Sequence, residues 1–334
     1  MTLSTTFARG RPYLVPALLL ALAVGLVASQ TTRPLALLDM WRPWGEVGTL
    51  AVVMTAIMLT GGIDLSVGSM IALASVTLGV VWQAGWSMPW AAAAAIGVGA
   101  AAGAINGTLV TIGIAPLVAT LATLAFYAGL AMALAQGQRV AGLPADFASL
   151  GQGSWLGVPN QLLIFALVWF MGWIVVHHTR FGRYVFALGD NALAAQFAAV
   201  PVRAVQWWLY TASGTLAALV AVIYCARSGA VVPNAGAGIE LQVIACVVLG
   251  GTRVTGGRGG LGRTLLGVAI LSLLDIGLQF ISGEIRVPWT GFAWQFSANS
   301  RLLLIGLLVI GVAVWNERAA AARLRPTAAG GQIR

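Results

Sequence analysis

Apolar residues are arranged along the chain in ten long blocks, separated by short polar or glycine-rich stretches. We place these blocks at residues 13–29, 44–60, 64–82, 88–112, 115–136, 160–178, 203–226, 240–251, 261–281 and 299–316. A helix needs about 20 apolar residues to cross the hydrocarbon core of a membrane. The pattern therefore predicts an all-α fold, a polytopic transmembrane helical bundle with about ten membrane segments.

Two pairs of blocks are interrupted by glycine, 44–60 with 64–82 and 240–251 with 261–281. Lipid cannot form hydrogen bonds with the backbone groups that such an interruption frees. We therefore expect discontinuous helices at both places, with protein or water beside them.

The composition supports a membrane protein. Of the 334 residues, 59% are hydrophobic and 8% are charged, whereas a soluble domain carries roughly 25% charged residues. A soluble fold of this composition would have to expose an apolar surface to water. We predict a single transmembrane domain at 13–316, between a cytoplasmic N-terminus at 1–12 and a cytoplasmic tail at 317–334.

The net charge is +9, and every one of the 18 basic residues is arginine. Arginines cluster around 9–11, 180–203, 253–263 and 318–334, and ten spans would place all four clusters on one side. The positive-inside rule makes that side cytoplasmic, which predicts a bacterial inner-membrane protein with both termini inside. Eight spans with re-entrant segments would also keep some of these clusters inside. The sequence lacks a basic stripe with interleaved aromatic residues, the pattern that would indicate nucleic-acid binding.

Enzyme motifs are missing from the sequence. Without lysine there is no Walker-type phosphate loop, so ATP hydrolysis would need a partner. Residues 257–262 match GxGxxG but lie between membrane segments, where tight turning and helix packing explain glycine better. Cys225 and Cys246 lack metal-site spacing, and the adjacent His177 and His178 cannot share a helix face. We predict no catalytic residue, no metal and no cofactor.

Asp64 lies deep in an apolar stretch, within the run Thr60-Gly61-Gly62-Ile63-Asp64-Leu65-Ser66. An acidic residue at membrane depth is costly and is therefore a candidate functional residue. Its carboxylate could instead cap the next helix by accepting the free N–H of Ser66 or Val67. The two roles are compatible, because a helix N-terminus at membrane depth usually faces a cavity.

Other polar residues of the apolar blocks can line a translocation path or pair helices, and pairing is the commoner role. The path candidates are Gly61, Gly62, Asp64, Ser66, Asn106, Thr120, Thr123 and Gln242, and Asp275 and Gln279 belong to the same group of intramembrane polar residues.

The longest predicted cytoplasmic loop is 179–202. It begins with basic residues, and Asp190 or Asn191 is well placed to cap a short helix over Ala192 to Val200. We expect Gly189 and Asp190 to be exposed where this helix starts. It is either an ordinary interfacial helix or a contact for a cytoplasmic motor.

Four motifs resemble the ribose/xylose/arabinose class of ABC permeases. They are GGIDLSVGSMIALAS at 61–75, PLVATLATLAFYAGLA at 116–131, FGRYVFALGDNALAAQFAAVPV at 181–202 and GIELQVIACVVLGGTRVTGGRGGLGRTLLG at 238–267. Within that class the chain is most similar to rhamnose or autoinducer-2 permeases. One departure lies at 249–262, where the class often has GGxSxxGGxG and this chain has Thr252, Arg253 and Arg258.

The resemblance implies a permease subunit in the lipid membrane that imports a monosaccharide or a related polyol-like solute. It implies three protein partners: an ABC ATPase subunit, a periplasmic sugar-binding protein and a second permease subunit, identical or paired. It also implies that the loop at 179–202 makes the ATPase-coupling contact, through Gly182, Arg183, Gly189, Asp190 and Asn191. A competing hypothesis is a secondary transporter or channel, which would use Asp64 or Asp275 for ion coupling.

Overall fold

A computed structural model describes residues 38–280 without a gap, together with residues 25, 284–286, 293–295, 303, 306–307, 310–311 and 314. The predicted segments 13–29 and 299–316 lie outside the continuous range. The chain divides into two parts, residues 32–268 and residues 1–31 with 269–334.

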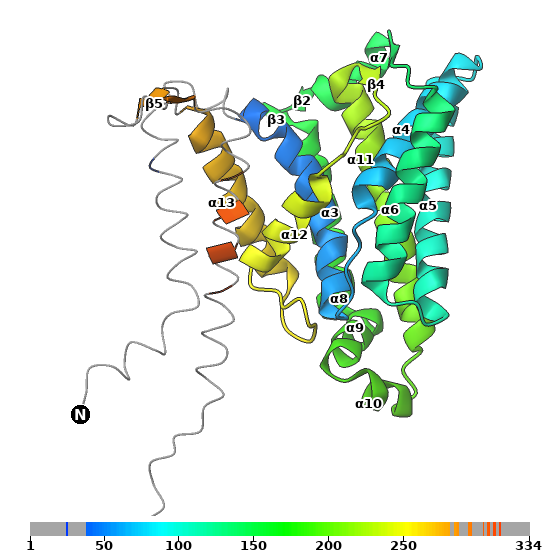
Figure 1. Ribbon diagram of the computed structural model, residues 1–334, viewed down its shortest axis with the longest axis vertical. Coiled ribbons are helices and arrows are strands. Elements are labelled where there is room, and N and C mark those ends of the chain that lie inside the picture. The colour runs from blue at the N-terminus through cyan, green and yellow to red at the C-terminus, as the bar shows by residue number, and fades with distance from the viewer. Residues whose placement is uncertain are drawn as a thin grey trace, which may run out of the picture. The chain divides into compact units, whose positions relative to one another are not determined.

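Each of the apolar segments predicted between residues 44 and 281 is a helix (Figure 1). In chain order these helices are α3 (Arg42–Leu59), α4 (Val67–Gln83), α5 (Met88–Thr111), α6 (Pro116–Ala135), α8 (Asn160–His178), α11 (Val202–Ser228), α12 (Ile239–Leu249) and α13 (Leu261–Gln279). Both predicted interruptions are confirmed. The chain is not helical between Leu59 and Val67, and a glycine-rich turn separates α12 from α13.

The described part of the chain does not confirm the predicted number of membrane spans. In the described part of the chain, five helices are long and apolar enough to cross a membrane, namely α5, α6, α8, α11 and α13. The apolar helices α4 and α12 have only 17 and 11 residues. The all-α, multi-span class is therefore confirmed, whereas ten spans are not.

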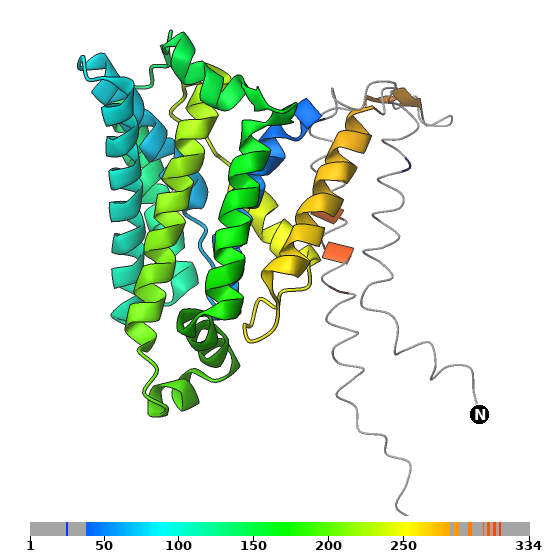
Figure 2. The ribbon, with the colours of Figure 1, turned by 180° about the vertical axis from the view of Figure 1, so that it is seen from behind.

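Helices α5 and α11 lie side by side, as Figures 1 and 2 both show. Gly99, Gly103 and Gly107, one helical turn apart, form the α5 face of this contact. A Cβ atom at Gly103 would overlap the carbonyl oxygen of Tyr210, and one at Gly107 would come within 2.9 Å of the Trp207 backbone. Small residues at four-residue spacing let two membrane helices approach closely, so these glycines fix the α5–α11 contact.

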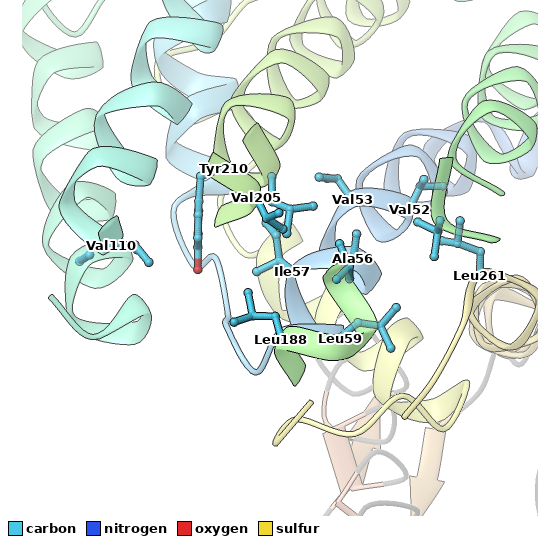
Figure 3. Packing of buried hydrophobic residues seen from close by; sticks show 14 residues of the cluster. Val52, Val53, Ala56, Ile57, Leu59, Val110, Leu188, Val205, Tyr210 and Leu261 are labelled. Atoms are coloured by element: carbon cyan, nitrogen blue, oxygen red, sulfur yellow. The ribbon is translucent and has the colours of Figure 1, made fainter. Parts of the chain in front are cut away.

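A hydrophobic cluster joins α3 to α11 and to a short helix of the loop at 179–202, α9 (Arg180–Asp190). Ile57 of α3 and Val205 of α11 lie at its centre, and Leu188 of α9 packs beneath them (Figure 3). Val185 of α9 is also fully buried in the cluster. The loop at 179–202 is therefore anchored to the bundle by its first helix.

The two ends of the bundle in the first part differ in structure. One end, the α7 end, carries α7 (Ala145–Gln152) and two small antiparallel sheets, β1 (Val140–Ala141) with β4 (Ala230–Val231) and β2 (Ser154–Trp155) with β3 (Val158–Pro159). The other end, the α9 end, carries α9 and α10 (Ala192–Phe197) (Figure 1). In the second part, β5 (Glu284–Arg286) pairs antiparallel with β6 (Ala293–Gln295).

Candidate functional site

The break between α3 and α4 contains a fully buried carboxylate, that of Asp64. Its Oδ1 accepts hydrogen bonds from the Ser66 N–H at 3.0 Å and the Ser66 hydroxyl at 2.6 Å. Its Oδ2 accepts one from the hydroxyl of Ser213 on α11, at 2.7 Å. The predicted bond to the Ser66 N–H is confirmed. Ser66 itself is the N-cap residue of α4, so Asp64 shapes the turn that leads into the helix.

Further hydrogen bonds extend from Ser66 to two more helices. The Asn106 side-chain amide on α5 donates to the Ser66 hydroxyl oxygen at 2.7 Å. The Tyr127 hydroxyl on α6 lies within donating distance of Asn106 Oδ1, at 3.2 Å, and of the Ala102 carbonyl, at 2.9 Å. We call Asp64, Ser66, Asn106, Tyr127 and Ser213 the buried polar network. It ties the start of α4 to α5, α6 and α11.

The structure thus brings three of the predicted path residues together, Asp64, Ser66 and Asn106. All three are inaccessible to solvent in the single subunit, and their hydrogen bonds join neighbouring helices. Buried polar groups need such partners, because an unpaired one costs roughly 1–3 kcal/mol. Helix pairing is therefore the function that their contacts support, and a role in the path stays a prediction.

The remaining path candidates are distributed around the network. Thr120 and Thr123 face it from α6, and the Thr120 hydroxyl lies 3.3 Å from the Ile63 carbonyl of the break. Gly62 is buried, and a Cβ there would come within 2.8 Å of the Tyr210 hydroxyl. That hydroxyl is buried and has no hydrogen-bond partner within the described residues. Gly61 and Gln242 lie outside the network, Gly61 at the end of α3 and Gln242 on α12.

Sequence reasoning missed two members of the network, Tyr127 and Ser213. Tyr127 was detectable, because it follows Thr120 and Thr123 by seven and four residues and so shares their helix face. Ser213 has no such indication, since many small residues surround it on α11.

A second buried carboxylate, also missed, lies toward the α7 end. Glu46 of α3 is paired with the Arg227 guanidinium of α11, with Nε–Oε1 at 2.7 Å and Nη2–Oε2 at 3.0 Å. Close by, the Arg42 guanidinium donates to the carbonyls of Gly151 and Gly153 at 3.2 and 2.9 Å. The sequence did offer an indication, because Glu46 lies in one apolar block and Arg227 directly follows another. These bonds hold α3, α7 and α11 together.

The loop at 179–202 forms two helices, α9 and α10, where one short helix was predicted. The Thr179 hydroxyl caps α9 by accepting the Gly182 N–H at 3.4 Å. Asn191 Oδ1 caps α10 by accepting the Ala194 N–H at 3.0 Å, as predicted. We call residues 179–197 the α9–α10 hairpin. Its residues Arg183 and Asp190 are exposed.

The expectation for Gly189 was wrong. Gly189 and Asp190 end α9 and do not begin α10. Gly189 packs against backbone, because a Cβ there would overlap the Leu59 carbonyl and lie 2.6 Å from the Gly257 nitrogen. Gly182 is likewise buried against the Val176 carbonyl. Both glycines therefore seat the hairpin on the bundle rather than present it to solvent.

The outer face of the hairpin is apolar at two positions of α10. Leu193 is 69% exposed and Phe197 is 91% exposed. Four residues separate them, so they lie on the same face of the helix. Large apolar side chains exposed together mark a surface that contacts another protein or the membrane.

An all-helical bundle with several helices long enough to cross a membrane and a broken helix pair is typical of membrane transport proteins. Comparison with known proteins gives the family. Residues 45–313 match the family described as branched-chain amino acid transport system / permease component, and the chain belongs to that family.

The chain is also similar to individual permeases. It is 36% identical over 265 residues to the ribose import permease protein RbsC of Escherichia coli strain K12, covering 78% of this chain and 80% of that protein. Identity to RbsC of Bacillus subtilis strain 168 is 37% over 266 residues, covering 79% and 83%. Identity to the autoinducer 2 import system permease protein LsrD of Yersinia enterocolitica is 35% over 305 residues, covering 88% and 89%. No solved structure matches the chain.

These findings confirm the resemblance to sugar-type and autoinducer-2 permeases. The chain is the permease component of a bacterial ABC importer, a multi-pass membrane protein whose role is transport and not covalent chemistry. Membership of this family implies an ATPase and a solute-binding protein as partners.

Proposed function

We propose that the chain carries a monosaccharide, or a related small polyol-like solute, into the cytoplasm. The names of its relatives, which import ribose and autoinducer 2, support this solute class. The contacts of the buried carboxylates favour this function over ion-coupled transport. Asp64 accepts three hydrogen bonds and Glu46 is paired with Arg227, so both carboxylates are already engaged in contacts between helices.

The α9–α10 hairpin is the proposed docking element for the ATPase. The observation that carries this proposal is the exposed pair Leu193 and Phe197 on a helix whose neighbour α9 is anchored in the core. An anchored element with an apolar outer face can enter a groove on a partner and transmit its movement. Arg183 and Asp190 of the same hairpin are exposed, which suits the polar rim of an interface.

Charge supports a cytoplasmic position for the α9 end. Arg180, Arg183 and Arg203 lie at this end, and so do Arg253 and Arg258 in the turn between α12 and α13 (Figure 1). Clustered arginines beside apolar helices favour the cytoplasmic side. The binding protein would then dock at the α7 end, where Trp155 and Leu156 are exposed. Both termini would be cytoplasmic. Lipid and a second permease subunit would cover apolar faces such as that of α8, which exposes Leu167, Phe170 and Met171.

The docking proposal is tested by removing the apolar face of α10. The double variant Leu193→Ser with Phe197→Ser should bind the cognate ATPase at least tenfold more weakly, because central aromatic anchors contribute roughly 2 kcal/mol or more to an interface. The measurement is co-purification of the ATPase with the detergent-solubilised permease, together with ATP hydrolysis stimulated by solute-loaded binding protein.

Gln196→Ser is the matched control, since Gln196 is exposed on the same helix and should leave both measurements unchanged. Normal ATPase recovery and normal stimulation with the double variant would exclude α10 as the docking element.

A further inference from the structure

Three segments that are far apart in sequence meet through their backbones at the α9 end. They are the end of α3 at Leu59 to Gly61, the end of α9 at Gly189, and the turn at Gly256 and Gly257. The Gly257 N–H donates to the Leu59 carbonyl at 2.9 Å. We call this set the glycine junction.

Each glycine of the junction is placed where a side chain would meet another segment's backbone. A Cβ at Gly256 would lie 2.8 Å from the Gly61 nitrogen and 3.0 Å from the Leu59 oxygen. A Cβ at Gly257 would lie 3.0 Å from the Gly189 oxygen, and one at Gly189 would overlap the Leu59 carbonyl. The three backbones are therefore in direct contact, with no side chain between them.

Direct backbone contact matters for the transmission of movement. A long side chain can change rotamer and absorb a small displacement of the element that it touches. Close-packed backbone has no such freedom, because protein interiors are dense and transmit strain. A displacement of the α9–α10 hairpin would thus reach the end of α3 nearly undiminished.

From the end of α3 the chain runs directly into the buried polar network. Leu59 is the last residue of α3, and Asp64 follows five residues later in the non-helical break. Along this segment the Ile63 carbonyl faces the Thr120 hydroxyl at 3.3 Å, and Asp64 binds Ser66 and Ser213. The break is thus held on α5, α6 and α11, and its α3 end adjoins the glycine junction.

We propose that the glycine junction passes the movement of the α9–α10 hairpin to the α3–α4 break, and that Gly189 and Gly257 are positioning residues for coupled transport. The proposal rests on the docking function assigned to the hairpin. On this proposal the moving element of the subunit is the break. Gly257 takes part in the coupling although it lies outside the hairpin. A purely structural role would make both glycines matter for folding alone.

The test compares two junction variants with two matched controls. Gly189→Ala and Gly257→Ala each insert a methyl group between contacting backbones. Gly251→Ala is the control for backbone strain, because Gly251 has a positive φ of 85° like the 74° of Gly257 but meets nothing within 4 Å. Gly262→Ala, at the start of α13, also meets nothing within 4 Å and controls for the added methyl group alone.

The readout is solute molecules transported per ATP hydrolysed, in proteoliposomes that contain the permease, its ATPase and the binding protein. Both junction variants should still bind the ATPase and hydrolyse ATP, but this ratio should fall at least fivefold. Both controls should keep the ratio within a factor of two. If the ratio is unchanged in both junction variants, or falls equally in the controls, the proposal is wrong. If one junction variant fails to fold, the other decides.

This outcome is separable from failure of the docking proposal. If the hairpin does not dock, the Leu193→Ser and Phe197→Ser variant keeps its ATPase whatever the junction variants do. If the hairpin docks but the junction does not transmit, that variant loses the ATPase while Gly189→Ala and Gly257→Ala transport normally.

Discussion

The two ends of the bundle are held together in different ways. At the α7 end, backbone also packs closely, Gly151 against Arg227, and long side chains are added to it, with Glu46 paired to Arg227 and Arg42 bound to the Gly151 carbonyl. At the α9 end, the segments contact one another directly through their backbones at Gly189 and Gly257. Side-chain bridges can lengthen or exchange partners, whereas backbone contacts move as one body. The difference is that buried charge pairing is added to backbone packing at the α7 end, whereas the contacts of the glycine junction are made by backbone alone.

The largest effect is expected from breaking the bridge at the α7 end. Arg227→Met removes the partner of a carboxylate that is only 3% exposed. Leaving a buried charge unpaired costs about 3–5 kcal/mol, so the solubilised protein should lose several degrees of thermal stability or fail to accumulate. The measurement is the unfolding temperature in detergent.

A second substitution sharpens this prediction. Adding Glu46→Gln to Arg227→Met removes the stranded charge and should restore most of the lost stability. If Arg227→Met unfolds at the normal temperature, or if Glu46→Gln makes it worse, the bridge does not hold the α7 end.

A smaller, graded effect is expected at Asp64, between the two ends. Asp64→Leu removes the acceptor of three hydrogen bonds and should abolish transport and destabilise the subunit. Asp64→Asn keeps one accepting oxygen and should cost only about 1–2 kcal/mol, the order of one buried hydrogen bond, and retain most transport. Solute uptake and the unfolding temperature of the two variants measure this grading.

If Asp64→Asn and Asp64→Leu have equal solute uptake and equal unfolding temperatures, the hydrogen bonds accepted by Asp64 do not explain its role. An Asn variant with normal stability but no transport would instead point to a direct need for the charge, as in an ion-coupled transporter.

Much of the fold was predictable from the sequence, because apolar blocks and glycine interruptions are local features. The helices at α5, α6 and α8 start and end within a few residues of the predicted limits. The cap at Asn191 was equally local. The number of membrane spans does not follow from composition, because a broken or short apolar helix such as α12 has the same composition as a helix that crosses the membrane.

The contacts between distant segments were the part that sequence reasoning could not reach. Ser213 binds Asp64 across 149 positions of the chain, and nothing near Ser213 indicates it. Gly189 was expected to be an exposed loop residue, because glycine between helices usually marks a turn. Its packing against Leu59 and Gly257 depends on how α9 folds back on the bundle, which no local pattern records.

The central claim is that this permease imports its solute with energy supplied by a partner's ATP hydrolysis. The most direct test is uptake of labelled ribose into proteoliposomes that contain the chain and its ATPase, with the binding protein added on the α7 side. We predict uptake that requires ATP on the α9 side and the binding protein, and that survives collapse of proton and sodium gradients. The account would be contradicted if ribose, or another solute of the same class, entered without ATP and only while an ion gradient lasted.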